Sequence, residues 1–378
     1  MLKFNEIKSI LSSSWTPFSE NESKNAITNC NNSSTPSLDK LLWSHLKHIF
    51  HDNKCLNNII RITNMCLDLG FWPSHFKTLT MIVIPKPNKS LYNTPKSFRP
   101  IVLLNTLGKL IKKIISDRLQ FHAISNNVIY QSQLRRLKFK FTMDAGIALT
   151  HIIYSGWVKN LSMNTLAFNI SQFFPSLNHH LLTLILGKVG FNLCVVKFFS
   201  NYLIGRKTNY FWNSFTSPSF DVNIGVGQGS ALSPILSALY LLPFLYILEN
   251  CLKNLKILIS ILSFVDNGLF IVQSKSFHLS NSRLFCSYNV MLNLLLKFGF
   301  IVEHLKTEVF HFNRSQGSFN PPPLDLLSIS GPILHSKDSW KYLGFIFDRK
   351  LSFYHYIDFY SNKAMSTVKC MKILGNSV

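Results

Sequence analysis

A single carboxylate interrupts an apolar stretch of the chain at Asp266. The surrounding sequence, ILSFVDNGLF over residues 261–270, is otherwise almost wholly apolar up to the Asn267-Gly268 pair. Asn-Gly between two β-branched-rich segments is the strongest short signal for a two-residue hairpin turn. One interpretation of Asp266 is therefore a turn aspartate. The other interpretation is a catalytic acid. The flanking segments predict strands that are buried on both faces, and a turn alone does not explain a single charged residue between them.

The composition indicates a partner that carries phosphates. The 378 residues include 39 Lys and Arg against 17 Asp and Glu, a formal net charge of +22. Such an excess is typical of proteins that bind nucleic acid, with an anionic membrane surface as the rival partner. A hydrophobic share of 47% is sufficient for a core and excludes a disordered chain.

Three features of the sequence bear on the cellular compartment. No basic segment followed by an apolar core opens the chain, so we expect no secretory signal and an intracellular protein. The seven cysteines are scattered without a C-x-x-C pair, which indicates reduced, structural thiols. Residues 231–248 carry no charge and reach the lower length limit of a membrane span. Pro234, Pro243 and several hydroxyls favour a helix buried in protein, so a membrane protein is only a third hypothesis.

The elements before Asp266 begin with a polar segment. Residues 1–40 are rich in Ser, Asn and Thr and predict a mobile arm. Apolar residues at helical spacing over residues 38–69 predict a pair of helices, and residues 79–84 predict a strand that runs into a basic, proline-rich loop. The segment LGKLIKKIISDRLQ, residues 107–120, predicts an amphipathic helix whose cationic face is formed by Lys109, Lys112, Lys113 and Arg118.

The second half of the chain predicts strands around a glycine loop. Residues 165–174 read as a strand that ends in a turn, and residues 225–234, GVGQGSALSP, as a glycine loop that opens a helix. The hairpin at Asp266 follows, and residues 297–312 and 340–348 add further strands. Because strands occur both in runs and between helices, the predicted fold class is α+β.

Six segments in this order resemble the reverse transcriptase domain of LINE-like (non-LTR) retrotransposons. They are FRPIVLLNTLGKLIKKIISDRL (98–119), LAFNISQFFPSLNHHLL (166–182), GVGQGSALSPILSALYL (225–241), SFVDNGLFI (263–271), FGFIVEHLKTE (298–308) and WKYLGFIFDRKLSF (340–353). The resemblance covers residues 78–370 and implies a right-hand polymerase fold with an antiparallel palm sheet backed by helices. It divides the chain into a Ser/Asn-rich arm and helical extension (1–74), fingers (75–165), palm (166–348) and the start of a truncated thumb (349–378).

The resemblance also implies nucleotidyl transfer assisted by two Mg²⁺ ions, which contact the attacking and leaving oxygens and are themselves held by carboxylates. The three carboxylates of the family map onto Asn169, Asp266 and Asn267, so only one of the three is still an acid. An amide oxygen can coordinate Mg²⁺ but cannot neutralise it. We therefore expect weakened Mg²⁺ binding and a polymerase activity that is weak or absent.

Other positions match the family's functional residues more fully. Phe174 corresponds to the aromatic wall under the sugar, although plain core packing also explains it. The remaining matches are Gln228 and Gly229 in the nucleotide pocket, Lys86, Lys96 and Arg99 at the triphosphate, Lys306 at the leaving pyrophosphate, and Trp340, Tyr342, Leu343 and Gly344 in a primer-holding hairpin. For the two fingers lysines, a solvated basic loop is the equally open alternative.

The implied partners are an RNA template, a DNA primer and deoxynucleotides, in the nucleus. Two departures from the sequence pattern of the family affect the expected contacts with these partners. The segment QSQLRRLKFKFT, residues 131–142, replaces a Q-x-G-F-R-like motif, so the template path through the fingers differs. The sequence also shows no endonuclease, which would be supplied elsewhere, and looks like a fragment. The alternative function is a non-catalytic, nucleic-acid-binding remnant, whose binding would depend steeply on salt but not on Mg²⁺.

Overall fold

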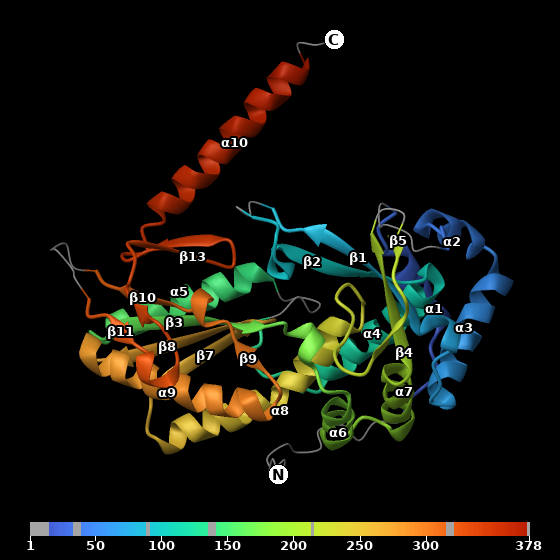
Figure 1. The fold of residues 1–378 in the computed structure, drawn as a ribbon, viewed down its shortest axis with the longest axis horizontal. Coiled ribbons are helices and arrows are strands. Elements are labelled where there is room, and N and C mark those ends of the chain that lie inside the picture. Colours follow the sequence, from blue (N-terminus) through green and yellow to red (C-terminus); the bar gives the residue numbers. More distant parts are fainter. Residues whose placement is uncertain are drawn as a thin grey trace. The chain divides into compact units, whose positions relative to one another are not determined.

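The chain is described by a computed structural model over residues 15–32, 39–87, 91–134, 141–212, 215–314 and 321–375 (Figure 1). It divides into two compact units. Unit 1 comprises Met1–Gln131, Gln172–Ile247 and Lys297–Phe300, and unit 2 comprises Ser132–Ser171, Leu248–Leu296 and Ile301–Val378. Both units mix helices and strands, which confirms the α+β class.

Unit 1 combines a five-stranded sheet with helices. Its helices are α1 (Glu20–Thr28), α2 (Trp43–Ile49), α3 (Asn53–Asp68), α4 (Thr106–Ser125), α6 (His179–Val189), α7 (Leu193–Leu203) and most of α8 (Ser233–Asn254). Its strands are β1 (Thr78–Pro85), β2 (Phe98–Leu103), β4 (Arg206–Trp212), β5 (Phe215–Thr216) and β6 (Phe220–Val222). Strand β1 pairs antiparallel with β2 and parallel with β4, which in turn pairs with β5 and β6. The predicted helix pair is confirmed as α2 and α3, and the predicted first strand as β1.

Helix α1 corrects the prediction of a mobile arm at Glu20–Thr28, whereas residues 1–14 and 33–38 of that predicted arm lie outside the described residues. Ser19 caps the helix, because its hydroxyl accepts the N–H of Glu22 while the Glu22 carboxylate accepts the N–H of Ser19. The same carboxylate pairs with the guanidinium of Arg118 on α4. The polar composition of the segment did not predict this helix, because the helix is stabilised by that distant arginine and by the burial of Ala26 and Ile27.

Helix α4 is amphipathic as predicted, but some residues of its predicted cationic face are buried. Lys112 is only 2% exposed, and its Nζ lies 5.2 Å from the ring centroid of Trp72 and 5.4 Å from that of Tyr202. The guanidinium of Arg206 lies 6.0 Å from the same Tyr202 ring. Burial lowers the pKa of Lys112. Within the described ranges no carboxylate forms an ion pair with this lysine.

Unit 2 is built on an antiparallel sheet of strand order β10-β3-β8-β7. Its strands are β3 (Ser162–Ser171), β7 (Ile259–Phe264), β8 (Asn267–Ser274), β9 (Ile301–Val302), β10 (Glu308–Phe312), β11 (Leu324–Asp325), β12 (Ile333–Leu334), β13 (Ser339–Tyr342) and β14 (Phe345–Asp348). Its helices are α5 (Thr142–Val158), α9 (Phe277–Lys297) and α10 (Tyr354–Gly375). The predicted antiparallel sheet is therefore confirmed.

Helices α5 and α9 support this sheet. Leu149, Ile153 and Trp157 of α5 share one apolar core with Met163 of β3 and Phe310 of β10. On α9, the Asn281 side chain accepts a hydrogen bond from Asn164 of β3 (3.3 Å) and contacts the His311 ring of β10 (3.2 Å). Helix α10, which belongs to unit 2, starts beside the β13–β14 hairpin (Figure 1). Its described side chains, up to Met371, are exposed apart from that of half-buried Tyr356.

Two expectations from composition can be compared with the structure. All seven cysteines lie in the described residues and are free thiols, as expected. Helix α8 is the one helix of the described chain that is long and apolar enough to cross a membrane, and 72% of its apolar window is buried inside the protein. Such burial is the property expected of a core helix.

The predicted hairpin is confirmed as β7–β8, but its turn lies two residues earlier than predicted. Phe264 pairs with Asn267, so the turn residues are Val265 and Asp266, and Asn267 begins β8. Val265 has a φ of +58°, which is strained for a β-branched residue. Gly268 is required for packing instead, because a Cβ there would lie inside the ring of Phe168, its partner on β3.

Gly268→Ala should therefore lower the free energy of unfolding by roughly 1–3 kcal/mol, since the added methyl group overpacks the sheet against Phe168. Gly187→Ala on α6 is the matched control. No heavy atom lies within 4 Å of a Cβ at Gly187, so alanine there should raise stability by up to about 1 kcal/mol. Urea unfolding of both variants tests this, and equal effects would contradict the packing role of Gly268.

Lys112→Met should raise the free energy of unfolding by about 1–3 kcal/mol, because it removes a buried ammonium without a counter-ion and keeps a similar volume. Lys113→Met is the control. Lys113 is partly exposed and pairs with Asp117 at 2.7 Å, so its loss should cost about 0.3–0.5 kcal/mol. Thermal unfolding at one pH measures both, and a destabilised Lys112→Met would show that the ammonium is favourably held by the rings.

Candidate active site

Three side chains meet where β3 ends beside the β7–β8 turn. Asn169 lies opposite Asn267 in the β3–β8 register, and the N–H of Ile170 donates to the carbonyl oxygen of Asp266 at 2.8 Å. The Asn169 amide donates to Asp266 Oδ2 at 3.1 Å and to Asn267 Oδ1 at 3.2 Å. The Asn267 amide donates to Asp266 Oδ1 at 3.1 Å. The expected convergence of two positions 97 residues apart is confirmed.

The donor set of this triad, Asn169, Asp266 and Asn267, does not fit a pair of Mg²⁺ ions. It carries one negative charge, and both Asp266 oxygens already accept amide N–H groups. Amide N–H groups that point at the carboxylate occupy positions where a cation needs oxygens. The described residues contain no group of three His, Cys, Asp or Glu side chains that could hold a metal. The triad is a hydrogen-bonded polar cluster with one acid.

Lys306 lies on a segment tied directly to the triad. The N–H of Glu303 donates to the carbonyl oxygen of Asn169 at 2.8 Å, and the Glu303 carboxylate holds the Lys306 ammonium at 2.7 Å. Lys306 sits in the short 3₁₀ helix His304–Lys306 and keeps most of its side chain exposed. Sequence reasoning missed Glu303, although its i,i+3 spacing to Lys306 is a recognisable ion-pair signal. The role of Lys306 in catalysis stays a prediction.

The β13–β14 hairpin places the predicted primer-holding residues in two environments. Trp340 and Tyr342 are 3% and 5% exposed, stack with ring centroids 4.9 Å apart, and belong to the core of unit 2. Leu343 and Gly344 form the turn with φ of +48° and +93°. These two rings therefore contribute to core packing, and their contact with a primer stays a prediction. Contact through the turn backbone stays a prediction.

In unit 1, the glycine loop connects Phe174 to β2. Its Val226 N–H donates to the carbonyl oxygen of Phe174 at 2.9 Å, and the Gln228 carbonyl oxygen accepts the N–H of Val102 at 3.4 Å. Gly229 has a φ of +104°, which explains the glycine. Phe174 is half-buried, while its neighbour Phe173 is buried and stacks on Phe300. Phe173 thus supplies the core packing at this point. The contact of Phe174 with the sugar of a nucleotide stays a prediction.

The predicted triphosphate cations follow the β1–β2 pair. Arg99 is exposed and lies opposite Ile84 in the register. The Lys86 N–H donates to the Ser97 carbonyl oxygen at 2.9 Å, which continues the pairing past β1. The side chain of Lys96 lies outside the described residues, as do residues 135–140 of the divergent QSQLRRLKFKFT segment. Only two of the three cations can thus be placed.

An aromatic surface of unit 1 was not predicted from the sequence. Phe98 makes edge contacts with Tyr92 and Trp212, each with ring centroids 5.9 Å apart, at an open cavity of about 850 Å³. Tyr92 and Trp212 remain exposed. Exposed aromatic rings can stack nucleobases. Trp212 is far from Phe98 in sequence, so no local spacing indicated that the two rings meet.

Comparison with known proteins identifies the family. The model of the family described as reverse transcriptase (RNA-dependent DNA polymerase) matches residues 84–347, more than half of the chain. The chain is 26% identical over 227 residues to a probable RNA-directed DNA polymerase from transposon X-element of Drosophila melanogaster, covering 60% of this chain and 24% of the relative. It is 24% identical over 316 residues to the RNA-directed DNA polymerase from mobile element jockey of the same organism, covering 81% and 32%. The chain thus spans about a quarter to a third of these relatives.

Among solved structures, the fold is similar to that of telomerase. A Candida albicans telomerase, solved with a TWJ fragment of telomeric RNA, matches 75% of this chain and 48% of its own at a TM-score of 0.50 and 14% identity. A Candida tropicalis telomerase matches 73% and 44% at the same score and identity. These likenesses show a polymerase fold. The chain belongs to the reverse transcriptase family, and its domain is related to the polymerases of non-LTR retrotransposons.

Proposed function

We propose that this chain is the polymerase segment of a non-LTR retrotransposon protein that binds a primed RNA template but is impaired in nucleotidyl transfer. The observation that carries the proposal is the hydrogen-bonded triad of Asn169, Asp266 and Asn267 at the position of the family's metal carboxylates. Two Mg²⁺ ions supply the charge that this reaction needs, and one acid holds them poorly. Loss of a single electrostatic group commonly costs about 10²- to 10³-fold in rate, and two acids should cost more.

The proposed layout is a right hand. Residues 1–74 form an extension, 75–165 the fingers, 166–348 the palm and 349–378 the start of the thumb. The sheet of unit 2 supports the palm assignment, because it holds the triad at the end of its central strand. The β1–β2 pair supports the fingers assignment, because it presents Arg99 on an exposed strand.

The proposed partners are an RNA template, a DNA primer and deoxynucleotides, in the nucleus, with any endonuclease activity supplied outside these residues. Guanidinium groups suit a bidentate grip on phosphate, which fits Arg99. The exposed rings of Tyr92 and Trp212 offer stacking surfaces for bases. These features bind nucleic acid without the triad, so they support equally the second candidate, a nucleic-acid-binding protein without catalysis.

The Asn169→Asp/Asn267→Asp double variant should extend a primed RNA template at least about 10³-fold faster than the native chain in Mg²⁺, because it restores two carboxylates to the triad. Primer extension followed on a denaturing gel measures the rates. The matched control adds Asp266→Asn to the double variant, which lowers the number of carboxylates in the triad from three to two and should abolish the gain. Equal rates for the native chain and the double variant would contradict the proposal.

If the native chain and the double variant both extend the primer slowly, a cation-binding measurement still distinguishes them. Isothermal titration with Mn²⁺ should detect binding to the double variant and far weaker binding to the native chain. Fluorescence anisotropy with an RNA/DNA hybrid in EDTA should give equal affinities for both, falling steeply with salt. Equal extension rates together with this salt-dependent binding would favour the second candidate.

A further inference from the structure

We infer that unit 2 contains a binding pocket for a neutral aromatic small molecule, between α5 and the β13–β14 hairpin. The cavity has a volume of about 400 Å³, within the range of sites that take drug-sized ligands. It lies apart from the triad residues, none of which line it. The inference does not depend on whether the chain polymerises DNA.

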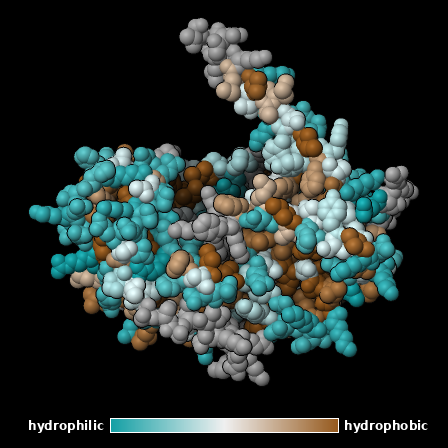
Figure 2. Space-filling view, turned by 180° about the vertical axis from the view of Figure 1, so that it is seen from behind, coloured by the Kyte–Doolittle hydropathy of each residue, from teal (hydrophilic) through white to brown (hydrophobic). Residues whose placement is uncertain are grey.

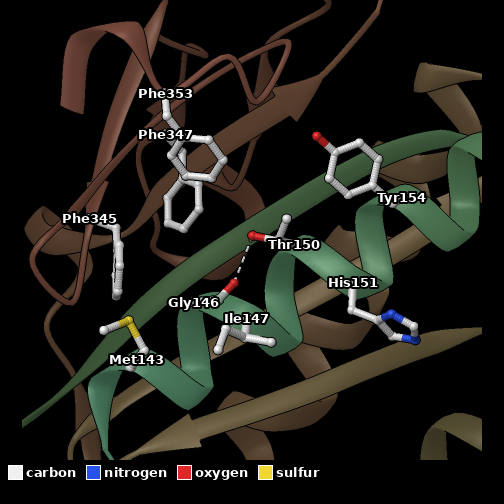
Figure 3. A pocket seen from close by; sticks show the side chains of 9 residues that line it. All are labelled: Met143, Gly146, Ile147, Thr150, His151, Tyr154, Phe345, Phe347 and Phe353. Carbon is white, nitrogen blue, oxygen red and sulfur yellow. Dashed lines mark hydrogen bonds between the residues drawn. The ribbon is translucent and has the colours of Figure 1, made fainter. Parts of the chain in front are cut away.

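Aromatic rings of the hairpin form one wall of the pocket. Phe347 is fully buried at its floor, with Phe345 and Phe353 each at a ring-centroid distance of 5.9 Å from it. Figure 3 shows the Phe345 ring facing Met143 of α5, with the rings of Phe347 and Phe353 farther along the pocket. Gly146 permits the approach of the two elements, because a Cβ there would come 2.9 Å from the ring of Phe345. The pocket is thus formed by the close contact of a ring with the backbone of a helix inside unit 2.

The polar groups of the pocket determine what it can accept. The Thr150 hydroxyl donates to the Gly146 carbonyl oxygen at 2.8 Å, so its proton is already used. Figure 3 shows His151 projecting away from the phenylalanine rings, which leaves Tyr154 as the polar group at the far end. Among the residues that the structure describes, no Lys, Arg, Asp or Glu lines the cavity, although the chain carries a net charge of +22.

This lining selects against nucleotides and for neutral aromatic ligands. A phosphate taken into the cavity would lose water without gaining a cation, which is costly. A flat aromatic molecule gains apolar burial and edge or offset contacts with three phenylalanine rings. One polar substituent can be matched by the Tyr154 hydroxyl. The ligand class is therefore an uncharged aromatic compound with at most one polar end.

Occupancy of the pocket would brace the hairpin and the start of α10. Phe345 and Phe347 belong to β14, and the Phe345 ring also stacks on Tyr356 of α10 at 5.8 Å. The other side chains of α10 that the structure describes, up to Met371, are exposed, and Figure 2 shows apolar side chains gathered at the surface near the base of the helix. A ligand wedged against Phe345 would therefore restrict the attachment of this helix.

Titration of the full chain with N-phenyl-1-naphthylamine, a neutral aromatic dye that becomes fluorescent in apolar sites, tests the inference. The native chain should show saturable binding with a component that belongs to this pocket, beside any dye taken up by the open aromatic cavity of unit 1. Ile147→Asp should weaken that binding at least tenfold, because it places a carboxylate at the mouth of the pocket on a side chain that is 62% exposed and therefore tolerant of charge. Met143→Glu, on the same rim, should do the same.

The matched control is Val158→Asp, on the same helix but outside the pocket and 81% exposed. It should leave the dye affinity unchanged within twofold. Excess dTTP should not displace the dye, whereas an uncharged biphenyl compound should. Non-saturable binding, equal loss in Val158→Asp and Ile147→Asp, or displacement by dTTP would each overturn the inference. Circular dichroism of each variant separates loss of the site from loss of the fold.

Discussion

The register of β3 against β8 is the constraint on which the candidate site depends. It places Asn169 opposite Asn267 and Phe168 opposite Gly268. Because side chains alternate between the faces of a sheet, a slip of one residue would turn every side chain of the strand to the other face. It would also set a residue with a Cβ against the Phe168 ring, where only Gly268 leaves room. The packing on one face of the sheet therefore fixes the polar triad on the other.

Amides at two positions of the triad alter its chemistry without altering its shape. Asparagine and aspartate have nearly the same volume, so the register can hold either. Three carboxylates so close would repel each other until cations neutralised them, and their pKa values would rise. The present triad needs no cation, because the N–H groups of Asn169 and Asn267 satisfy both oxygens of Asp266. Compared with the three carboxylates that the family resemblance implies, the two amides therefore remove the repulsion that such a site would have without cations.

The sequence predicted those features whose cause lies in local spacing. Apolar periodicity predicted the α2–α3 pair and β1, and glycine positions predicted the glycine loop and the β7–β8 hairpin. The family resemblance predicted that Asn169 meets the tip of this hairpin. Features fixed by distant partners were not predictable. The exact turn depends on Phe168, helix α1 on Arg118, and the burial of Trp340 on Phe310. In each case the deciding atom lies far away in the sequence.

Because several cations are buried, the net charge of the chain does not measure the electrostatic attraction that a phosphate at the surface would experience. Lys112 and Arg206 are enclosed in unit 1, and Arg118 is buried against Glu22. Asp-to-Asn changes such as those inferred in the triad raise the net charge without adding a cation to any surface. The count of +22 therefore overstates the electrostatic attraction for nucleic acid, which depends on the cations that can reach phosphates. Exposed cations such as Arg99 are retained independently of the triad, so binding of nucleic acid and catalysis can be lost separately.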